Sequence, residues 1–267
     1  MTIPMQWALR RRMMMAALGS GIDVAALSIT YTGAYTDYGM VTMSDGARYR
    51  LLAFTSSGTL SIEQPVNCEV CVVGGGANGA NAGGAGAYLK NQSVSAYNGG
   101  SVVVGARQGV SSIADVSVNA VSGQNGGTGA GGNTAGTGDG LSKYPFEDTG
   151  YSLWAGKPHC AGGGQGAYKV ETGPRVIRGY NGGNGGTNGG NGYPRASSWT
   201  SSPSGGVGGS YGGGAGGAGN GGNATYYGSG AGGGEHYERE DGSQRFYDGG
   251  SGYQGIVYMR IPEDQAA

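Results

Sequence analysis

Charged residues are scarce in this chain: of its 267 residues, 16 are Lys or Arg and 17 are Asp or Glu, which leaves a net charge of −1. Proteins that bind nucleic acid gather basic residues into a patch or stripe that neutralises phosphates. No apolar run approaches the ~20 residues of a membrane-spanning helix. The sequence therefore argues against a nucleic-acid partner and against insertion into a membrane.

Cysteine and histidine are also rare, with three and two residues. Cys68 and Cys71 form a C-x-x-C pattern, but in a strand residues three apart point to opposite faces. A redox pair needs a helix N-terminus, and a metal site needs a second cluster of ligands. His159 and Cys160 are sequence neighbours, and only special local geometry makes such neighbours a catalytic pair. We therefore expect no metal, no cofactor, no catalytic residue and no enzymatic activity.

Two further motifs suggest chemistry that their context does not support. Residues 74–79 match G-x-G-x-x-G, but a dinucleotide site also needs a following helix and an acidic residue about 20 positions on. Here the next acidic residue is Asp115. A carboxylate cluster that offers glycosidase or calcium chemistry in principle comprises Glu235, Glu238, Glu240 and Asp241. Because Arg239 and Arg245 are interleaved with it, we interpret this cluster as a solvated charged loop.

Glycine, by contrast, is abundant, with 63 residues, and the stretch from Gly205 to Gly234 holds seventeen glycines in thirty positions. Gly-Gly-X triplets within it repeat every three residues. That period fits a polyproline-II-type helix and fits neither an α-helix nor a strand. Faces without side chains allow such helices to pack backbone to backbone, with N–H···O bonds between them. We therefore predict a packed bundle of polyglycine-II helices, with a disordered glycine-rich linker as the alternative.

The sequence around the glycine runs predicts strands. β-Branched and aromatic residues, separated by turn residues, indicate strands over 24–31, 40–43, 48–54, 59–62 and 69–73, weaker ones over 88–89, 102–104 and 116–121, and a closing strand over 255–261. Residues 1–18 place Ile3, Trp7, Met14 and Leu18 on one helical face, and Gly19 stops the helix. We favour a docking or self-association helix; a signal peptide or an ordinary core helix are the alternatives. The expected fold class is mostly β plus a polyglycine-II helix bundle.

Aromatic and arginine residues gather in the segments between the later glycine runs. They suit binding loops, because aromatic side chains give rigid contact area and small polar neighbours adapt. Residues 166–180 carry a net charge of +2, and residues 235–248 carry −3. The alternative is that the aromatic residues cap and cover the bundle. The candidate binding residues are Tyr144, Phe146, Tyr151, Trp154, Tyr168, Arg175, Arg178, Tyr180, Tyr193, Arg195, Trp199, Tyr226, Tyr227, His236, Tyr237, Arg239, Phe246 and Tyr247.

Three features occur in order along the chain: an apolar strand that runs into a glycine triplet (Cys71-Val72-Val73-Gly74-Gly75-Gly76), interrupted glycine runs, and a closing Gly-Ile-Val-Tyr-Met-Arg strand. Over about residues 50–262 this pattern resembles the glycine-rich domain of bacteriophage tail-fibre and receptor-binding proteins. It is also similar to tip adhesins of tailed phages, in which a polyglycine-II sandwich carries variable loops that bind the host. The resemblance implies a non-enzymatic adhesin at the tail-fibre tip of a virion, which recognises a host cell-surface protein or glycan.

The helical, strand and glycine patterns together suggest a division of the chain into three regions. Residues 1–20 would form the docking or oligomerisation helix, 21–73 a strand-rich attachment region, and 74–262 the glycine-rich receptor-binding domain. Other tail-fibre subunits are the expected partners, with the protein either a homotrimer or a monomer that caps a trimeric fibre. Two alternatives are a self-assembling glycine-rich surface or fibre protein without a dedicated receptor, and a tail-associated hydrolase.

Overall fold

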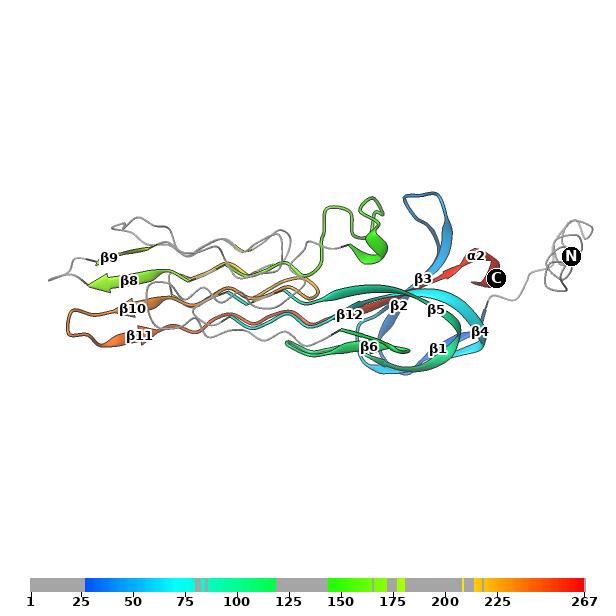
Figure 1. Ribbon diagram of the computed structural model, residues 1–267, viewed down its shortest axis with the longest axis horizontal. Helices are drawn as coiled ribbons and strands as arrows, with labels where there is room; N and C mark the ends of the chain where they lie inside the picture. Colours follow the sequence, from blue (N-terminus) through cyan, green and yellow to red (C-terminus); the bar gives the residue numbers. More distant parts are fainter. Residues whose placement is uncertain are drawn as a thin grey trace, which may run out of the picture.

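The computed structural model describes residues 27–79, 83–84, 86–118, 144–164, 166–171, 177–180, 208, 214–217 and 219–266. The helix expected over residues 1–20 lies outside them. Within these residues the strands form two sheets, at opposite ends of an elongated molecule (Figure 1). No helix in the described part of the chain is long and apolar enough to cross a membrane.

The larger sheet has eight strands in the order β2-β3-β12-β4-β5-β6-β7, with β1 paired to β4 outside this path. Its strands are antiparallel to their neighbours and rich in β-branched and aromatic residues, which favour pleated, half-buried backbone. They are β1 (Ile29–Tyr31), β2 (Tyr35–Thr42), β3 (Arg48–Phe54), β4 (Gly58–Val73), β5 (Leu89–Val103), β6 (Ser111–Ile113), β7 (Val116–Val118) and β12 (Ile256–Pro262).

Strand β12, near the C-terminal end of the chain, lies between β3 and β4. Val257 is opposite Phe54 of β3 on one side and opposite Val72 of β4 on the other. Residues 256–259 are all buried, as expected for a central strand that is covered on both faces. The chain therefore leaves this sheet at β7, passes through the glycine-rich region and returns to the middle of the same sheet.

Alternating strand positions supply two hydrophobic cores, one on each face of the larger sheet. The first core includes Leu52, Phe54, Val70, Val72, Val257 and Met259. The second includes Leu51, Ala53, Cys71, Val73, Ile256 and Tyr258. Segment 144–160, which contains the 3-10 turn η1 (Pro145–Glu147), packs on this second core with Phe146 and Trp154.

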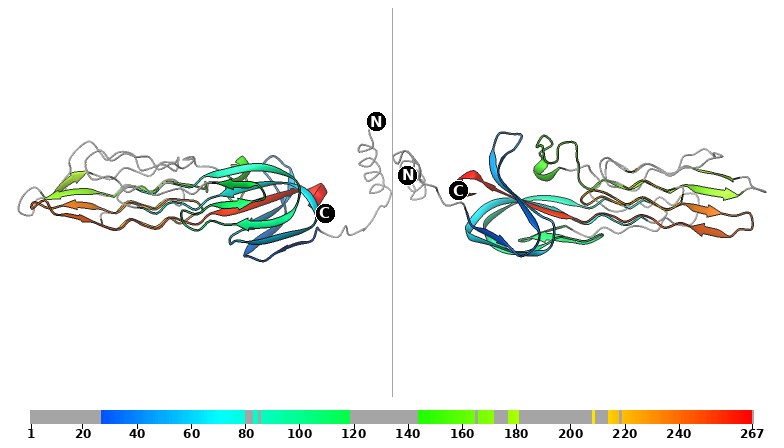
Figure 2. Two further views of the ribbon diagram at one scale, coloured as in Figure 1. Left: turned by 60° about the horizontal axis from the view of Figure 1, so that its bottom comes forward. Right: turned by 180° about the vertical axis from the view of Figure 1, so that it is seen from behind.

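The smaller sheet has four strands in the order β11-β10-β8-β9. They are β8 (Tyr168–Glu171), β9 (Ile177–Tyr180), β10 (His236–Glu238) and β11 (Gln244–Phe246). β8 and β10 pair in parallel, whereas β9 and β11 add to them in antiparallel. Figure 1 shows this sheet at the end of the molecule opposite to the short helix α2 (Glu263–Ala266), and both views of Figure 2 agree. We call this end the distal end.

Glycine-rich segments run between the two sheets, and their backbones bond directly to one another. The amide of Gly79 donates to the carbonyl of Gly250 at 3.0 Å, and that of Gly163 donates to the carbonyl of Gly84 at 2.9 Å. A β-carbon added to Gly163 would lie 1.7 Å from the carbonyl oxygen of Ala231. Glycine is required at such positions because neighbouring backbone occupies the space of a side chain.

The expected fold class, mostly β plus a bundle of polyglycine-II helices, is wrong. The described chain is mostly antiparallel β-sheet; its helical residues are confined to η1 and α2, and it contains no helix bundle. Glycine has no side chain with which to build a core, so the β-branched and aromatic segments determine the architecture. The sequence-based prediction gave the three-residue period of the glycine runs more weight than the strand pattern around them.

Candidate functional site

The structure separates the candidate binding residues into two groups. At the distal end, the smaller sheet and the residues next to it bring together Tyr168, Arg178, Tyr180, His236, Tyr237, Arg239, Phe246 and Tyr247. Against the larger sheet, segment 144–160 and the turn near 226 supply Tyr144, Phe146, Tyr151, Trp154, Tyr226 and Tyr227. The remaining candidates, Arg175, Tyr193, Arg195 and Trp199, lie outside the described residues.

An aromatic row crosses the smaller sheet. His236 of β10 is opposite Phe246 of β11 and opposite Tyr168 of β8, and Tyr168 is opposite Tyr180 of β9. The His236 and Phe246 rings are stacked, with centroids 4.4 Å apart and an interplanar angle of 22°. The Tyr168 ring meets His236 edge-on at 5.0 Å. The rings of Tyr168, His236 and Phe246, from residues up to 78 positions apart in sequence, are thus in contact with one another in a row.

Exposure differs sharply along this row. His236 is only 3% exposed, whereas Phe246 is 47% exposed. One face of the Phe246 ring lies against His236, and β11 is an edge strand. The exposed part of Phe246 therefore includes the ring face that is turned away from the sheet.

A second row, which contains the polar residues Gln244 and Glu238, lies two residues along from the aromatic row, on the same face of the sheet. Gln244 of β11 is opposite Glu238 of β10, and Glu238 is opposite Val170 of β8. The Tyr168 hydroxyl donates to Oε2 of Glu238 at 2.7 Å. This contact joins the two rows and orients the Glu238 carboxylate.

Charged pairs stabilise the parallel contact between β8 and β10. Lys169 Nζ lies 2.7 Å from Oε2 of Glu235, whose side chain is only 5% exposed. A buried carboxylate is costly unless it is paired, so Lys169 and Glu235 hold these two strands together.

The guanidinium of Arg245 lies 4.5 Å from the centre of the Tyr247 ring. Partial burial, and next the charge and hydrogen bonding of Glu171, raise the pKa of Tyr237.

The second group of candidates belongs largely to the core. Trp154 is fully buried, and its ring lies 4.8 Å from Tyr151 and 5.5 Å from Tyr258. Its indole N–H donates to the carbonyl of Asp148 at 2.5 Å. Phe146 is 9% exposed. Trp154 and Phe146 are therefore packing residues, and their assignment as receptor contacts is not supported by where they lie.

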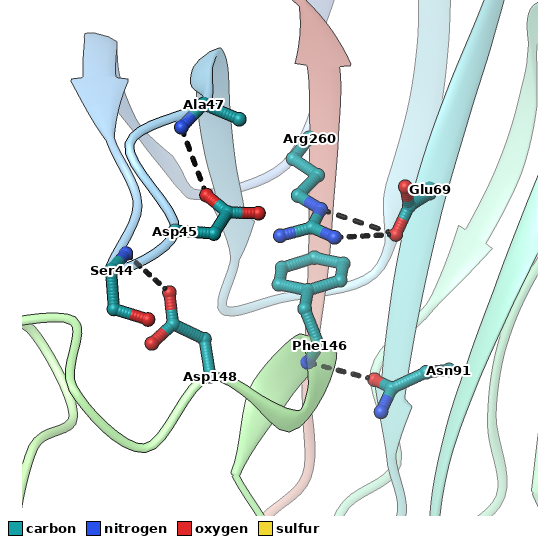
Figure 3. Close-up of polar contacts among 8 residues, drawn as sticks. All are labelled: Ser44, Asp45, Ala47, Glu69, Asn91, Phe146, Asp148 and Arg260. Carbon is teal, nitrogen blue, oxygen red and sulfur yellow. Dashed lines mark hydrogen bonds and ion pairs between the residues drawn. The ribbon is translucent and has the colours of Figure 1, made fainter.

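Asp148 fastens segment 144–160 to the β2–β3 hairpin, as Figure 3 shows. Its Oδ2 accepts the Ser44 amide at 2.9 Å, and its Oδ1 accepts the Gly150 and Tyr151 amides at 3.0 Å each. Burial acts to raise the pKa of Asp148, but hydrogen bonds from Ser44, Gly150 and Tyr151 outweigh it and lower the pKa. The carboxylate is an ordering element of the loop.

Tyr226 and Tyr227 surround a buried histidine. The His159 ring lies 4.9 Å from Tyr226 and 6.2 Å from Tyr227, and its Nε2 is 3.1 Å from the Tyr258 hydroxyl. Burial lowers the pKa of His159 to about 3. His159 is therefore neutral at physiological pH, and this cluster joins the turn at 226–227 to strand β12.

The chain was compared in sequence and structure with three groups: protein-family models, curated proteins and solved structures. None of them matches this chain significantly. Among the described residues, no group of three or more His, Cys, Asp or Glu side chains is arranged to hold a metal ion. The distal end, with its exposed and half-exposed aromatic and charged residues, is the candidate functional site.

Sequence reasoning missed two residues of this site, Lys169 and Gln244, and interpreted a third, Glu238, only as part of a solvated charged loop. Their neighbours were chosen as aromatic or arginine residues, so a lysine, a carboxylate and an amide did not qualify. One signal was available in the net charges of +2 over 166–180 and −3 over 235–248. Opposite charges on two segments favour their pairing, as Lys169 and Glu235 show.

Proposed function

We propose that this protein is a bacteriophage tail-fibre tip adhesin, which binds a receptor on the host cell surface through its distal end. One observation carries the proposal: strands β8 and β9 and strands β10 and β11, which are distant in sequence, meet in a small sheet at one end of an elongated molecule. The β10–β11 hairpin carries the exposed residues Arg239 and Phe246 and the half-buried Tyr237. The resemblance of the glycine pattern to phage receptor-binding proteins points in the same direction.

The construction of the molecule suits this role. Residues around the distal sheet are held by direct backbone hydrogen bonds, such as Ala167 N–H to the Gly217 carbonyl at 3.0 Å and Glu235 N–H to the Gly219 carbonyl at 2.7 Å. A binding surface that is ordered in advance loses less conformational entropy when it binds. The larger sheet, at the other end, is the side that would face other tail-fibre subunits. Within the tail fibre the protein would be either a homotrimer or a monomer that caps a trimeric fibre.

The proposal is tested with labelled, purified protein and a panel of intact bacterial strains. A phage adhesin binds some strains and not others, and cells that lack one surface receptor lose the binding. A correctly folded protein that binds no strain, or that binds every strain equally, would overturn the proposal. Filaments in electron micrographs of a non-binding protein would favour the self-assembling structural role instead.

A further inference from the structure

The ring of Phe246 is an exposed apolar group among the charged residues of the distal end. At the distal end Phe246 is 47% exposed, yet its ring is held in place because the other face stacks on the buried ring of His236. His236 in turn is held by the edge of Tyr168. The exposed ring is therefore a flat apolar platform that is already ordered. It loses little conformational freedom when a ligand binds to it.

Planar polar groups lie beside the platform. Gln244, two residues from Phe246 on the same strand face, is exposed, and its amide both donates and accepts hydrogen bonds. Opposite it, the carboxylate of Glu238 is oriented by the hydroxyl of Tyr168 at 2.7 Å. An aromatic ring with adjacent amide and carboxylate groups matches a ligand that has one apolar face and a rim of hydroxyl groups.

The negative charge around the platform restricts the charge that a ligand can carry. Residues 235–248 carry a net charge of −3. That charge already includes the two arginines of the hairpin, Arg239 and Arg245. Lys169, on the neighbouring strand β8, is paired with Glu235. An anionic ligand, such as a phosphorylated or acidic polysaccharide, would be repelled by this hairpin. A neutral ligand meets no such barrier.

We propose that Phe246, Gln244 and Glu238 form a subsite for a neutral sugar ring in a host-surface polysaccharide. The C–H groups on one face of the sugar lie on the electron-rich face of Phe246, and its hydroxyl groups bond to Gln244 and Glu238. This inference rests on the proposed adhesin function and narrows its receptor from protein or glycan to a neutral glycan.

The test uses the full chain and surface polysaccharide extracted from a strain that the protein binds. Three substitutions separate the possible roles of the ring: Phe246→Ala removes it, Phe246→Leu keeps an apolar side chain without a ring, and Phe246→Tyr keeps the ring. We expect Phe246→Ala and Phe246→Leu to weaken polysaccharide binding about tenfold or more, as for a central contact residue. We expect Phe246→Tyr to bind as the wild type does.

A matched control is Tyr38→Ala, which removes a 41% exposed aromatic side chain from β2 of the larger sheet. It should leave polysaccharide binding unchanged, and thermal melting should show that every variant is folded. In addition, free polysaccharide should compete with whole cells for the wild-type protein.

Two outcomes overturn the inference and leave the adhesin function intact. In one, the protein binds cells in a strain-restricted way but free polysaccharide neither binds nor competes. In the other, Phe246→Leu binds cells as well as wild type, which indicates an apolar contact with a receptor protein. If the folded protein binds no strain at all, the proposed function and the sugar subsite both fail.

Discussion

The guanidinium of Arg260 lies 4.5 Å from the centre of the Phe146 ring, which connects the last strand of the larger sheet to the turn η1 (Figure 3). The same guanidinium also lies 4.4 Å from the centre of the Tyr49 ring. Its Nη2 is also 2.7 Å from Oε2 of Glu69. Arg260 therefore makes two cation–π contacts and one ion pair.

Arg260→Met should lower the free energy of unfolding by about 1–2 kcal/mol, because it removes both ring contacts and the ion pair. Glu69→Gln removes only the ion pair, and since the Glu69 side chain is 37% exposed, its loss should be smaller than about 1 kcal/mol. Urea unfolding of the two variants measures the difference. Equal losses would show that the rings contribute nothing.

Trp154→Ala should destabilise the protein by about 3–5 kcal/mol, because a fully buried aromatic side chain leaves a cavity in the second core. The change also removes the hydrogen bond from the indole to Asp148. A surface counterpart is Tyr253→Ala, since Tyr253 is 36% exposed, and it should cost less than about 1 kcal/mol. Thermal melting decides: a Trp154→Ala variant that melts like wild type but loses cell binding would restore Trp154 as a receptor contact.

His159 makes stability depend on pH. Its pKa is lowered from 6.5 to about 3 in the folded state, because burial penalises the charged ring. The unfolded chain therefore binds the extra proton between these values, so this contribution is complete above pH 6.5 and is lost as pH falls toward 3. Between pH 7 and pH 4.5 the loss should be roughly 2–3 kcal/mol.

The measurement is urea unfolding over pH 4.5–7 for wild type and His159→Gln. Burial raises the pKa values of Tyr227 and Tyr258, which lie beside the ring, so both titrate above this window, and the lowered pKa of Asp148 places its titration below it. The variant should lose most of the slope. An unchanged slope would assign the pH dependence to other groups.

Close backbone packing predicts that alanine substitutions at two glycines differ strongly in their effect on stability. A β-carbon at Gly232 would lie 1.8 Å from the carbonyl oxygen of Ala215, so Gly232→Ala should prevent folding or cost several kcal/mol. A β-carbon added to Gly39 would have no atom within 4 Å beyond its chain neighbours, and the only obstacle is a φ of +65°. Gly39→Ala should therefore cost about 1–2 kcal/mol. If both variants give the same melting temperature, the tight packing of the glycine segments is wrong.

Part of the larger sheet was predictable from the sequence. The strand expected over 48–54 is β3, Arg48–Phe54, and the closing strand over 255–261 is β12, Ile256–Pro262. The strands expected over 59–62 and 69–73 are two parts of one strand, β4, which is irregularly paired with β5 between Ser61 and Cys68. A run of buried apolar residues predicts a strand by itself. Whether a strand continues through an irregular stretch, as β4 does, depends on its pairing with the neighbouring strand.

The smaller sheet was not predictable in the same way. Its strands have three or four residues each, and β11 is exposed throughout. Such short strands form only because distant segments meet, as β8 and β10 do, and no local pattern encodes that meeting. For the same reason the sequence could not separate exposed Phe246 from buried Trp154: both are aromatic residues in segments that contain glycine and charged residues, and only the fold determines which one faces solvent.

The measurement that bears most directly on the proposed adhesin is cell binding by a variant altered only at the distal end. Tyr237→Ala, Arg239→Ala and Phe246→Ala, combined, remove half-exposed and exposed side chains from the β10–β11 hairpin. With folding verified by thermal melting, this variant should bind a receptive strain at least about tenfold more weakly than wild type and Tyr38→Ala. Wild-type binding by the folded triple variant would contradict the assignment of the distal end as the receptor-binding site.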